Sequence, residues 1–517
     1  MKNSISTLTF LIILFINYCN GQQGEWVWIH GDTFNSSGNF GVQGVANSTN
    51  NPPPLYEPCE WTDLNGNFWL YGGLRSGCNG FCVYNDLWKY DPSSNEWTWM
   101  KGTGIPNDTT GNYGVQGVPA VTNQPPCRSW GAQSWVDLSG NLWMFGGEDD
   151  NSVAPYGWSD LWRFDTATNM WTWMKGSNIP GQPGVYGIKG VPNILNNPPP
   201  SIENAAAWTS NSGDLYLLEH SSNALWKYTI ALNMWTWIKG APSSPVVFGI
   251  KGVEDSLNNP GGSAYSRWKD NNGFFWKFDG GGILWRYNVA TNNWTWMSGD
   301  IPYVSVSNYG TMCSPALQNL PSGRNEGRAV WKDAIGNFWL FGGYSFFVGA
   351  GLSDMWVYNI SANQWTWAQG DSTLNANASY GTLGVSSPAN NPGYKEGAVG
   401  WSDNNGHFFL FGGSGSGSYN NALWKFTIDT SCFTVGIKEL NTTHQELKIY
   451  PNPANTTLNI CFYSDINIVI IDLLGETVFQ SNPADVIKGN VELDISFLSA
   501  GIYFIKTGNE VRKFVKK

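Results

Sequence analysis

Pairs of tryptophans separated by one residue recur at six places along the chain. The Trp-x-Trp triplets begin at Trp26, Trp97, Trp171, Trp235, Trp294 and Trp365, with spacings of 71, 74, 64, 59 and 71 residues. Alternate residues of a strand point to the same face of a sheet, so each triplet predicts a strand with both indoles on one side. A pattern repeated at this spacing predicts a stacked or radial array of similar units.

The unit that ends at Trp171 shows the pattern inside one repeat. Residues 129–137 and 141–145 predict two strands joined by a tight turn, and the second strand runs into Gly146-Gly147. After a loop, residues 160–165 predict a third strand, and a Thr-Ala-Thr-Asn turn leads to the triplet. Short apolar runs bounded by Gly, Asn and Asp are typical of antiparallel strands, so each unit is predicted to hold four.

The same four strands can be traced six times. The first strands carry Trp61, Trp135, Trp208, Trp268, Trp331 and Trp401, and the third strands carry Trp88, Trp162, Trp226, Trp285, Trp356 and Trp424. No triplet follows Thr427 in the sixth unit, whereas Trp26-Val27-Trp28 precedes every first strand. We expect the N-terminal strand to complete the last sheet and close a ring, because an open array would leave an exposed edge.

Double glycines end several of the second strands, at Gly72-Gly73, Gly146-Gly147, Gly342-Gly343 and Gly412-Gly413. With the aromatic third strand and the Trp-containing fourth, this pattern resembles the kelch repeats of galactose-oxidase-like proteins over residues 22 to about 430. The resemblance implies an all-β fold, a six-bladed kelch-type β-propeller closed by the N-terminal strand. The third unit departs from the pattern with Glu219-His220, and the fourth with Gly280-Gly281-Gly282 almost directly before the next strand.

The charge of the chain indicates which partners to exclude, and its N-terminal residues indicate where the protein is located. The 517 residues carry a net charge of -11 with 13% charged residues, which excludes a basic surface for nucleic acid. Lys2 followed by an apolar stretch predicts a cleaved signal peptide over residues 1–21, with a lipid anchor at Cys19 as the alternative. No later segment approaches the roughly 18 apolar residues of a membrane span, so no transmembrane helix is expected.

The C-terminal residues form a separate unit. Tryptophan is absent after residue 432, residues 433–446 predict a polar linker, and residues 447–517 predict a small β-sandwich of short strands. Its motifs resemble the type A C-terminal sorting domain of the type IX secretion system. They are Tyr450-Pro451-Asn452-Pro453, the Asp472 to Gly475 segment, Leu498 to Tyr503 with Gly501, and the Lys-rich end with Lys513. The resemblance implies that the type IX machinery is a partner and that the product is secreted or attached to the outer-membrane surface.

Catalytic and metal-binding patterns are absent from the sequence. The four histidines, His30, His220, His407 and His444, have no metal-ligand spacing, so no metal and no cofactor are predicted. Asp63, Asp137, Asp270, Asp333 and Asp403 each precede a glycine by three residues, and we interpret them as turn-capping groups rather than calcium ligands. Cys78 and Cys82 are predicted to form a disulfide, since a zinc site would need two further ligands.

The loops after the second strands differ in length between units. There are 13 residues between Gly73 and Leu87 and between Gly147 and Leu161, but 4 between His220 and Leu225 and 1 between Gly282 and Leu284. The face of the array that carries these loops is therefore predicted to be uneven, because the loops of the third and fourth units are short and leave a low sector there. Loop aromatics are predicted to form a ligand-binding platform above this sector, namely Phe81, Tyr84, Tyr156, Trp158, Tyr344, Phe346 and Phe347.

These observations favour a monomeric, non-catalytic binding module for glycans or for an extracellular protein. A carbohydrate-active enzyme, similar to sugar oxidases or epimerases, is the alternative. In that case Glu219, His220 and Arg328 would surround the central channel as acid-base and substrate-clamping groups. A purely structural role at the cell surface is a third hypothesis.

Overall fold

The computed structural model describes residues 24–429, apart from 79, 150–156, 202, 204, 221–222, 242–244, 262–264, 302, 305 and 416–417, and residues 448–517, apart from 463–467, 474–475, 482–488 and 508–509. The chain divides into two compact units with the boundary after Phe433. The predicted signal peptide and the predicted linker lie outside the described residues. Both units are built from β-strands, and the described helical structure is one short 3₁₀ helix, η1 (Ile230–Leu232).

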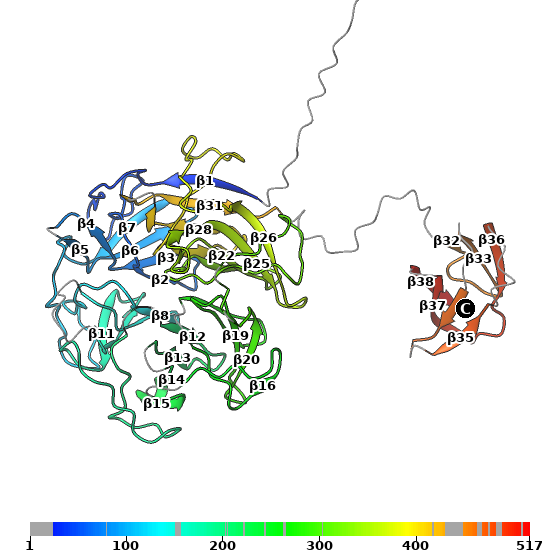
Figure 1. The fold of residues 1–517 in the computed structure, drawn as a ribbon, viewed down its shortest axis with the longest axis horizontal. Helices are drawn as coiled ribbons and strands as arrows, with labels where there is room; N and C mark the ends of the chain where they lie inside the picture. The colour runs from blue at the N-terminus through cyan, green and yellow to red at the C-terminus, as the bar shows by residue number, and fades with distance from the viewer. Residues whose placement is uncertain are drawn as a thin grey trace, which may run out of the picture. The chain divides into compact units, whose positions relative to one another are not determined.

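Six antiparallel sheets make up the larger unit (Figure 1). The strands of the first three are β2 (Cys59–Thr62), β3 (Phe68–Tyr71), β6 (Leu87–Asp91) and β7 (Glu96–Lys101); β8 (Gln133–Val136), β9 (Leu142–Phe145), β10 (Leu161–Asp165) and β11 (Met170–Lys175); and β12 (Ala206–Thr209), β13 (Leu215–Leu218), β14 (Leu225–Thr229) and β15 (Met234–Lys239). The next two hold β17 (Ser266–Lys269), β18 (Phe275–Phe278), β19 (Leu284–Asn288) and β20 (Asn293–Ser298), with β16 (Glu254–Asp255) as an added edge; and β21 (Val330–Lys332), β22 (Phe338–Phe341), β25 (Ser353–Asn359) and β26 (Gln364–Asp371).

The sixth sheet joins the two ends of this unit. It holds β27 (Val399–Ser402), β28 (Phe408–Phe411), β31 (Leu423–Thr427) and the N-terminal strand β1 (Glu25–His30). β1 pairs antiparallel with β31, with Trp28 opposite Trp424 and Trp26 opposite Phe426. The first strands of neighbouring sheets contact one another in the cyclic order β2, β8, β12, β17, β21 and β27, and β27 contacts β2.

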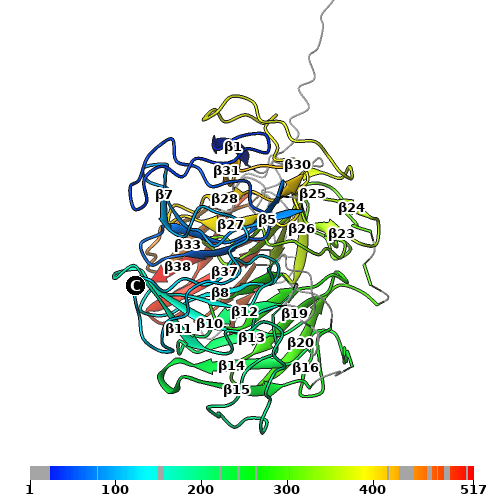
Figure 2. The same cartoon turned by 90° about the vertical axis from the view of Figure 1, so that its left-hand side faces the viewer.

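Three two-stranded ribbons stand in the loops after the second strands. They are β4 (Leu74–Ser76) with β5 (Phe81–Val83), β23 (Tyr344–Ser345) with β24 (Ala350–Gly351), and β29 (Ser414–Gly415) with β30 (Ser418–Tyr419). In Figure 2, β23, β24 and β30 lie on the right-hand side of the larger unit. The short connections of the third and fourth sheets have no such ribbon among their described residues.

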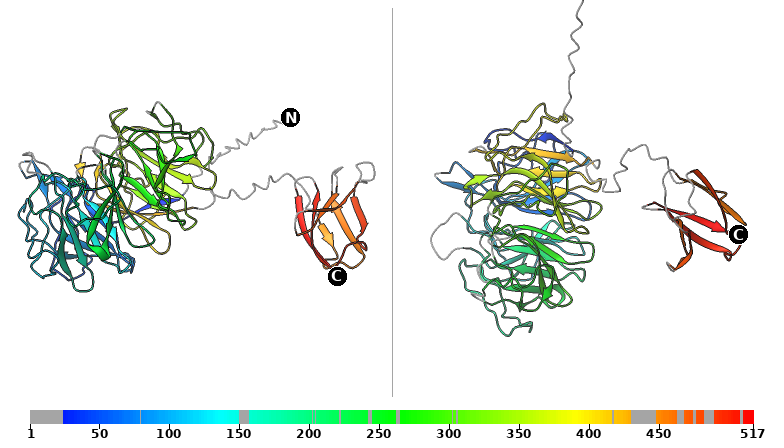
Figure 3. Two further views of the ribbon diagram at one scale, coloured as in Figure 1. Left: turned by 90° about the horizontal axis from the view of Figure 1, so that it is seen from below. Right: turned by 45° about the vertical axis from the view of Figure 1, so that its right-hand side comes forward.

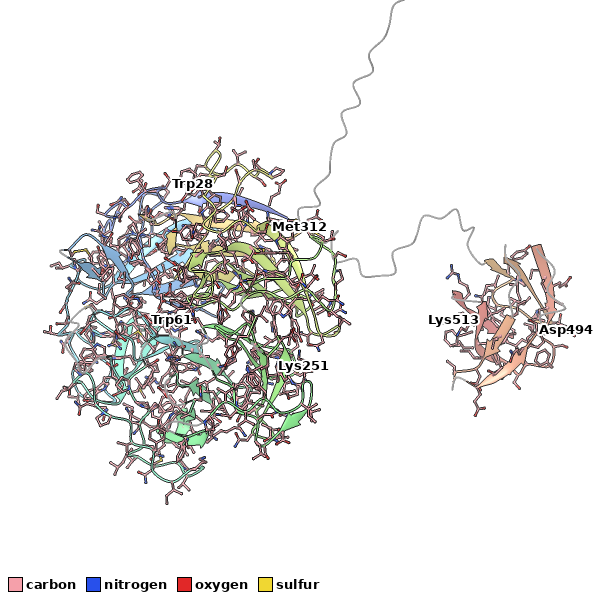
Figure 4. All side chains as sticks on the ribbon, in the orientation of Figure 1. Trp28, Trp61, Lys251, Met312, Asp494 and Lys513 are labelled. Carbon is pink, nitrogen blue, oxygen red and sulfur yellow. A yellow bond between two sulfur atoms is a disulfide. The ribbon has the colours of Figure 1, made fainter. Side chains whose placement is uncertain are left out.

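Tryptophan side chains bind neighbouring sheets together. Trp61, labelled in Figure 4, donates its indole N–H to the carbonyl of Trp143 in the next sheet at 2.9 Å. Trp135 makes the same bond to Tyr216 and Trp268 to Trp331. These first-strand indoles are almost fully buried in cores shared by two adjacent sheets. The repeated tryptophans therefore stabilise the packing of sheet on sheet, since buried indole N–H groups need an acceptor.

The C-terminal unit has two sheets with one apolar core (orange to red in Figure 3). One sheet holds β32 (Lys448–Tyr450), β33 (Thr457–Phe462) and β36 (Gly489–Asp494), and the other holds β35 (Thr477–Gln480), β34 (Ile468–Ile471), β37 (Gly501–Thr507) and β38 (Glu510–Lys516). Leu458 and Ile460 from the first sheet pack with Ile470, Ile505 and Phe514 from the second. Alternate residues of each strand supply this core, as the period of two requires.

Candidate functional site

A pocket of about 260 Å³ lies at the fourth sheet, beside the long loop that follows β22 in the fifth sheet. Its floor includes Gly280 and Gly281, in the short connection after β18. Phe346 and Phe347, from the turn between β23 and β24, and Tyr303, from the segment after β20, line the walls. The position of the pocket follows from unequal loop lengths, because a short connection next to a long one leaves a hollow.

Three aromatic rings of this pocket are accessible to solvent. Phe346, Phe347 and Tyr303 are 66%, 47% and 48% exposed, and the ring centroids of Tyr303 and Phe347 lie 6.5 Å apart. Gly281 makes room for Tyr303, because a Cβ at this glycine would lie 2.4 Å from Cδ1 of the ring. An exposed group of large apolar side chains in a hollow is typical of a binding surface.

Asp279 supplies a carboxyl group to the same pocket. Its Oδ1 accepts hydrogen bonds from the backbone N–H groups of Gly281 and Ile283, both at 3.0 Å. Burial raises the pKa of Asp279 to about 6, although Lys277 and these N–H groups act in the opposite direction. The pocket therefore combines apolar rings with a fixed acceptor.

The other loop aromatics do not add to this exposed surface. Tyr84 and Trp158 are each 3% exposed, so the prediction that they form an accessible platform needs correction. Tyr84 accepts a hydrogen bond from Arg75, and Trp158 packs against Tyr113 and below the guanidinium of Arg128. Loop aromatics become core residues here because the long loops fold back on the sheets.

Three further aromatics of the predicted platform have mixed positions. Phe81 is half-buried and packs edge-on against Trp130, with ring centroids 5.4 Å apart. Tyr344 is half-buried and packs edge-on against Phe346, with ring centroids 5.3 Å apart. Tyr156 lies outside the described residues. Of the predicted set, Phe346 and Phe347 are the two described residues that are both exposed and in the pocket.

Arg328 lies elsewhere, in a group of ionisable residues from several first strands. Its Nη2 donates to Oε2 of Glu60 at 2.7 Å, and its Nη1 lies 3.9 Å from Oε2 of Glu57. Tyr265 donates to the same Glu57 oxygen at 2.7 Å, and Arg267 lies 3.4 Å from Oε1 of Glu60. Glu219 and His220 directly follow β13, the second strand of the third sheet, and neither lines the cavity beside Arg328.

Burial changes the acidity of this group. It raises the pKa of Glu57 to about 8, because desolvation outweighs the opposing effect of Arg328. Nearby, Tyr56 donates a hydrogen bond to Glu326, whose pKa is raised by burial. Burial and the charge of Glu326 also raise the pKa of Glu396 to about 7. Glu57 is therefore mainly protonated at neutral pH, and Glu396 is protonated in part.

Arg328 was a candidate from the sequence, whereas Glu57, Glu60, Tyr265 and Arg267 were not. A signal for them exists, because each precedes a first-strand tryptophan by one to four residues, where other units have small residues such as Ala205, Ala207 and Ala398. Glu60 and Arg267 occupy equivalent positions one residue before their tryptophans, and Tyr265 and Arg328 occupy equivalent positions three residues before theirs.

Cys78 and Cys82 form a disulfide at the end of the β4–β5 ribbon. The bond closes the turn between these two strands. Among the described residues, no group of three or more His, Cys, Asp or Glu side chains is placed to hold a metal ion.

In the C-terminal unit, the Tyr-Pro-Asn-Pro motif packs against the last strand. Asn452 donates its side-chain amide to the Lys513 carbonyl at 3.0 Å and accepts the Val515 N–H at 2.9 Å. Tyr503, two residues after Gly501 in β37, is buried, donates to the Ser499 carbonyl and stacks on Phe514. Tyr450 ends β32, Pro451 and Pro453 follow in the exposed turn, and Gly475 lies outside the described residues. Motif residues distant in sequence thus contribute to one local structure.

Residues 448–517 match the family model of the secretion system C-terminal sorting domain. The C-terminal unit is thus a type IX sorting domain, which implies handling by the type IX secretion machinery and a secreted or cell-surface protein. A comparison with curated proteins gives no match. In the part of the chain that the structure describes, no helix has the length and apolar character needed to cross a membrane.

Proposed function

We propose that this exported protein is a non-catalytic carbohydrate-binding module, and that the pocket lined by Phe346, Phe347 and Tyr303 holds the sugar. The main support for this proposal is the group of three exposed aromatic rings in a pocket of about 260 Å³. Sugar rings present C–H faces that pack on aromatic rings, while their hydroxyl groups need polar partners. Asp279 is such a partner within the pocket.

The size of the pocket favours a glycan over a protein ligand. A stable protein partner buries about 800 Å² of each surface, far more than a hollow of this size provides. Among the described residues that line the pocket there is no lysine or arginine, which favours a neutral sugar over an acidic one. The ligand of this pocket is therefore a neutral glycan, held by one or two of its sugar rings.

The proposal includes the architecture that carries the pocket. Residues 22–432 form a six-bladed kelch-type β-propeller, closed by β1, between a signal peptide over residues 1–21 and a linker over residues 433–446. Support comes from the six sheets, the pairing of β1 with β31 and the cyclic contacts of the first strands. The double glycines directly follow second strands, as in kelch repeats, and Gly72 and Gly73 have φ of 69° and 86°, where L-residues are strained. The residues after 446 form a sorting β-sandwich, and the mature protein is a monomer without a cofactor.

A glycan array tests the binding function. The full-length protein is expected to bind a restricted set of neutral glycans, with and without added copper or calcium. A Phe346→Ala/Phe347→Ala variant is expected to lose this signal, whereas Phe34→Ala, which removes a ring that is 61% exposed outside the pocket, keeps it. Silence of the folded wild-type protein on the array, or full binding by the double variant, would contradict the proposal.

A further inference from the structure

A second cavity, of about 250 Å³, lies among the first strands and has a different chemistry. Its charged lining residues are Glu60 from β2, Arg267 from β17 and Arg328 just before β21. Tyr265 and Ser134 add hydroxyl groups. The cavity shares no lining residue with the aromatic pocket, so it is an independent candidate site.

Positive charge exceeds negative charge in this cavity at neutral pH. Glu60 is the shared partner of both arginines, through Oε2 for Arg328 at 2.7 Å and through Oε1 for Arg267 at 3.4 Å. Glu57 is the other carboxyl group near Arg328, and burial raises its pKa to about 8, so it is mainly protonated at pH 7. Two guanidinium groups therefore face one carboxylate, which leaves a net charge of about +1.

Arg328 also has donors without acceptors. The residue is 3% exposed, and its Nε and Nη1 have no hydrogen-bond partner among the described residues. Buried N–H groups of a charged side chain are costly to leave unpaired, so these positions favour a ligand oxygen. Guanidinium groups bind carboxylates particularly well, because several N–H donors surround one delocalised charge.

We propose that this cavity binds a small organic carboxylate with a single negative charge and hydroxyl groups, such as a sugar acid. One carboxylate matches the excess charge, whereas a dianion such as sulfate would exceed it. With a volume of about 250 Å³, the cavity has room for several water molecules or one sugar ring. Ser134 already accepts a bond from Arg267 at 3.0 Å, so hydroxyl groups of the ligand would extend an existing polar network.

The arginines differ in their contact with solvent. The side chains of Arg267 and Glu60 are 13% and 14% exposed, whereas that of Arg328 is 1% exposed. Arg267 and Glu60 therefore lie at the accessible side of the cavity, and Arg328 lies deeper. A ligand would meet Arg267 first; its carboxylate reaches Nε or Nη1 of Arg328 only if the deeper side chain shifts, because both atoms are buried and Nη1 lies 3.9 Å from Oε2 of Glu57.

Titration calorimetry of the full-length protein at pH 6.5 tests this site with D-glucuronate, D-glucose, acetate and sulfate as probes. Glucuronate is expected to bind at millimolar concentration or tighter, and glucose and sulfate at least tenfold more weakly. Acetate is expected to compete with glucuronate, because it carries the same charged group.

Two variants test whether glucuronate binds in this cavity. Arg267→Gln and Arg328→Lys are each expected to weaken glucuronate binding at least tenfold, whereas Lys332→Gln, which removes an exposed charge outside the cavity, leaves it unchanged. Thermal unfolding shows which variants are folded, and Arg267→Gln is informative even if the deeper Arg328→Lys does not fold. Absence of glucuronate binding, equal binding of glucose, preference for sulfate, or unchanged affinity in folded Arg267→Gln would each overturn the proposal.

Discussion

The aspartates in the tight turns act together with the second-strand tryptophans. Asp137 accepts the backbone N–H groups of Ser139 and Asn141 with Oδ1, and the indole N–H of Trp143 with Oδ2 at 2.8 Å. Asp63, Asp270 and Asp333 make the equivalent bonds to Trp69, Trp276 and Trp339. In the sixth sheet Asp403 binds His407 instead. This arrangement agrees with turn capping and leaves the carboxylate oxygens occupied by N–H donors.

We expect Asp137→Ala to lower the free energy of unfolding by about 2–3 kcal/mol, because charge-assisted bonds and a buried indole donor are lost. Chemical denaturation measures this change. Asp300→Ala is the matched control, since its side chain is 62% exposed and its effect should be within about 0.5 kcal/mol. A chelator should leave the stability of the wild-type protein unchanged, and a large loss on chelation would instead indicate calcium.

Glu57 predicts a specific pH dependence of stability. Its carboxyl group, which faces Arg328, Tyr265, Glu326 and Glu203, has a pKa raised from 4.5 to about 8 in the folded protein. Between these values the folded state keeps a proton that the unfolded state releases, so stability falls as pH rises from about 5 to 8. The contribution is at most about 1.4 kcal/mol per pH unit.

Denaturation of Glu57→Gln at several pH values isolates this contribution. The variant keeps an acceptor for Tyr265 but has no proton to release, so its stability should fall less steeply over the same range. Asp86, Asp279 and Glu396, whose pKa values burial raises to about 7, 6 and 7, remain in both proteins and keep part of the slope. An identical slope in the two proteins would show that Glu57 is ionised in the fold throughout.

At the scale of strands, the sequence predicts much of the larger unit. Trp-x-Trp triplets lie on β1, β7, β11, β15, β20 and β26, because alternation fixes which residues share a face. Loops have no such period, so the burial of Tyr84 and Trp158 could not be deduced from composition. Glu60 in β2 and Arg328 just before β21 are 268 residues apart and meet across two different sheets, and no local sequence pattern predicts such a contact.

The pairing of β1 with β31 is open to a direct test. Glu25 lies opposite Thr427 in the register, and neither residue is buried. Cysteines at both positions, Glu25→Cys/Thr427→Cys, are expected to form a disulfide in the folded protein, detected by mass spectrometry after proteolysis. Glu96→Cys/Thr427→Cys, which joins strands of different sheets, should not. Free thiols at positions 25 and 427 under oxidising conditions would contradict closure of the sixth sheet by β1.

At the scale of the whole molecule, the sorting domain determines the destination. A chain without residues 448–517 is expected to stay inside a cell that has a type IX secretion system, with the intact chain as the exported control. Immunoblotting of the medium, the cell surface and the cell contents measures this. Asn452→Ala should reduce export less than the full deletion, because it removes two bonds to β38 and leaves the core intact. Normal export of the truncated chain would contradict the assignment.

The aromatic pocket is the central claim about function, and titration calorimetry with the strongest neutral glycan from the array tests it most directly. The wild-type protein and Phe34→Ala should bind with the same Kd. Phe346→Ala/Phe347→Ala should bind at least tenfold more weakly, a loss of about 1.4 kcal/mol or more, while it unfolds at a similar temperature. An unchanged Kd in the folded double variant would contradict the account, since the glycan would then bind elsewhere on the protein.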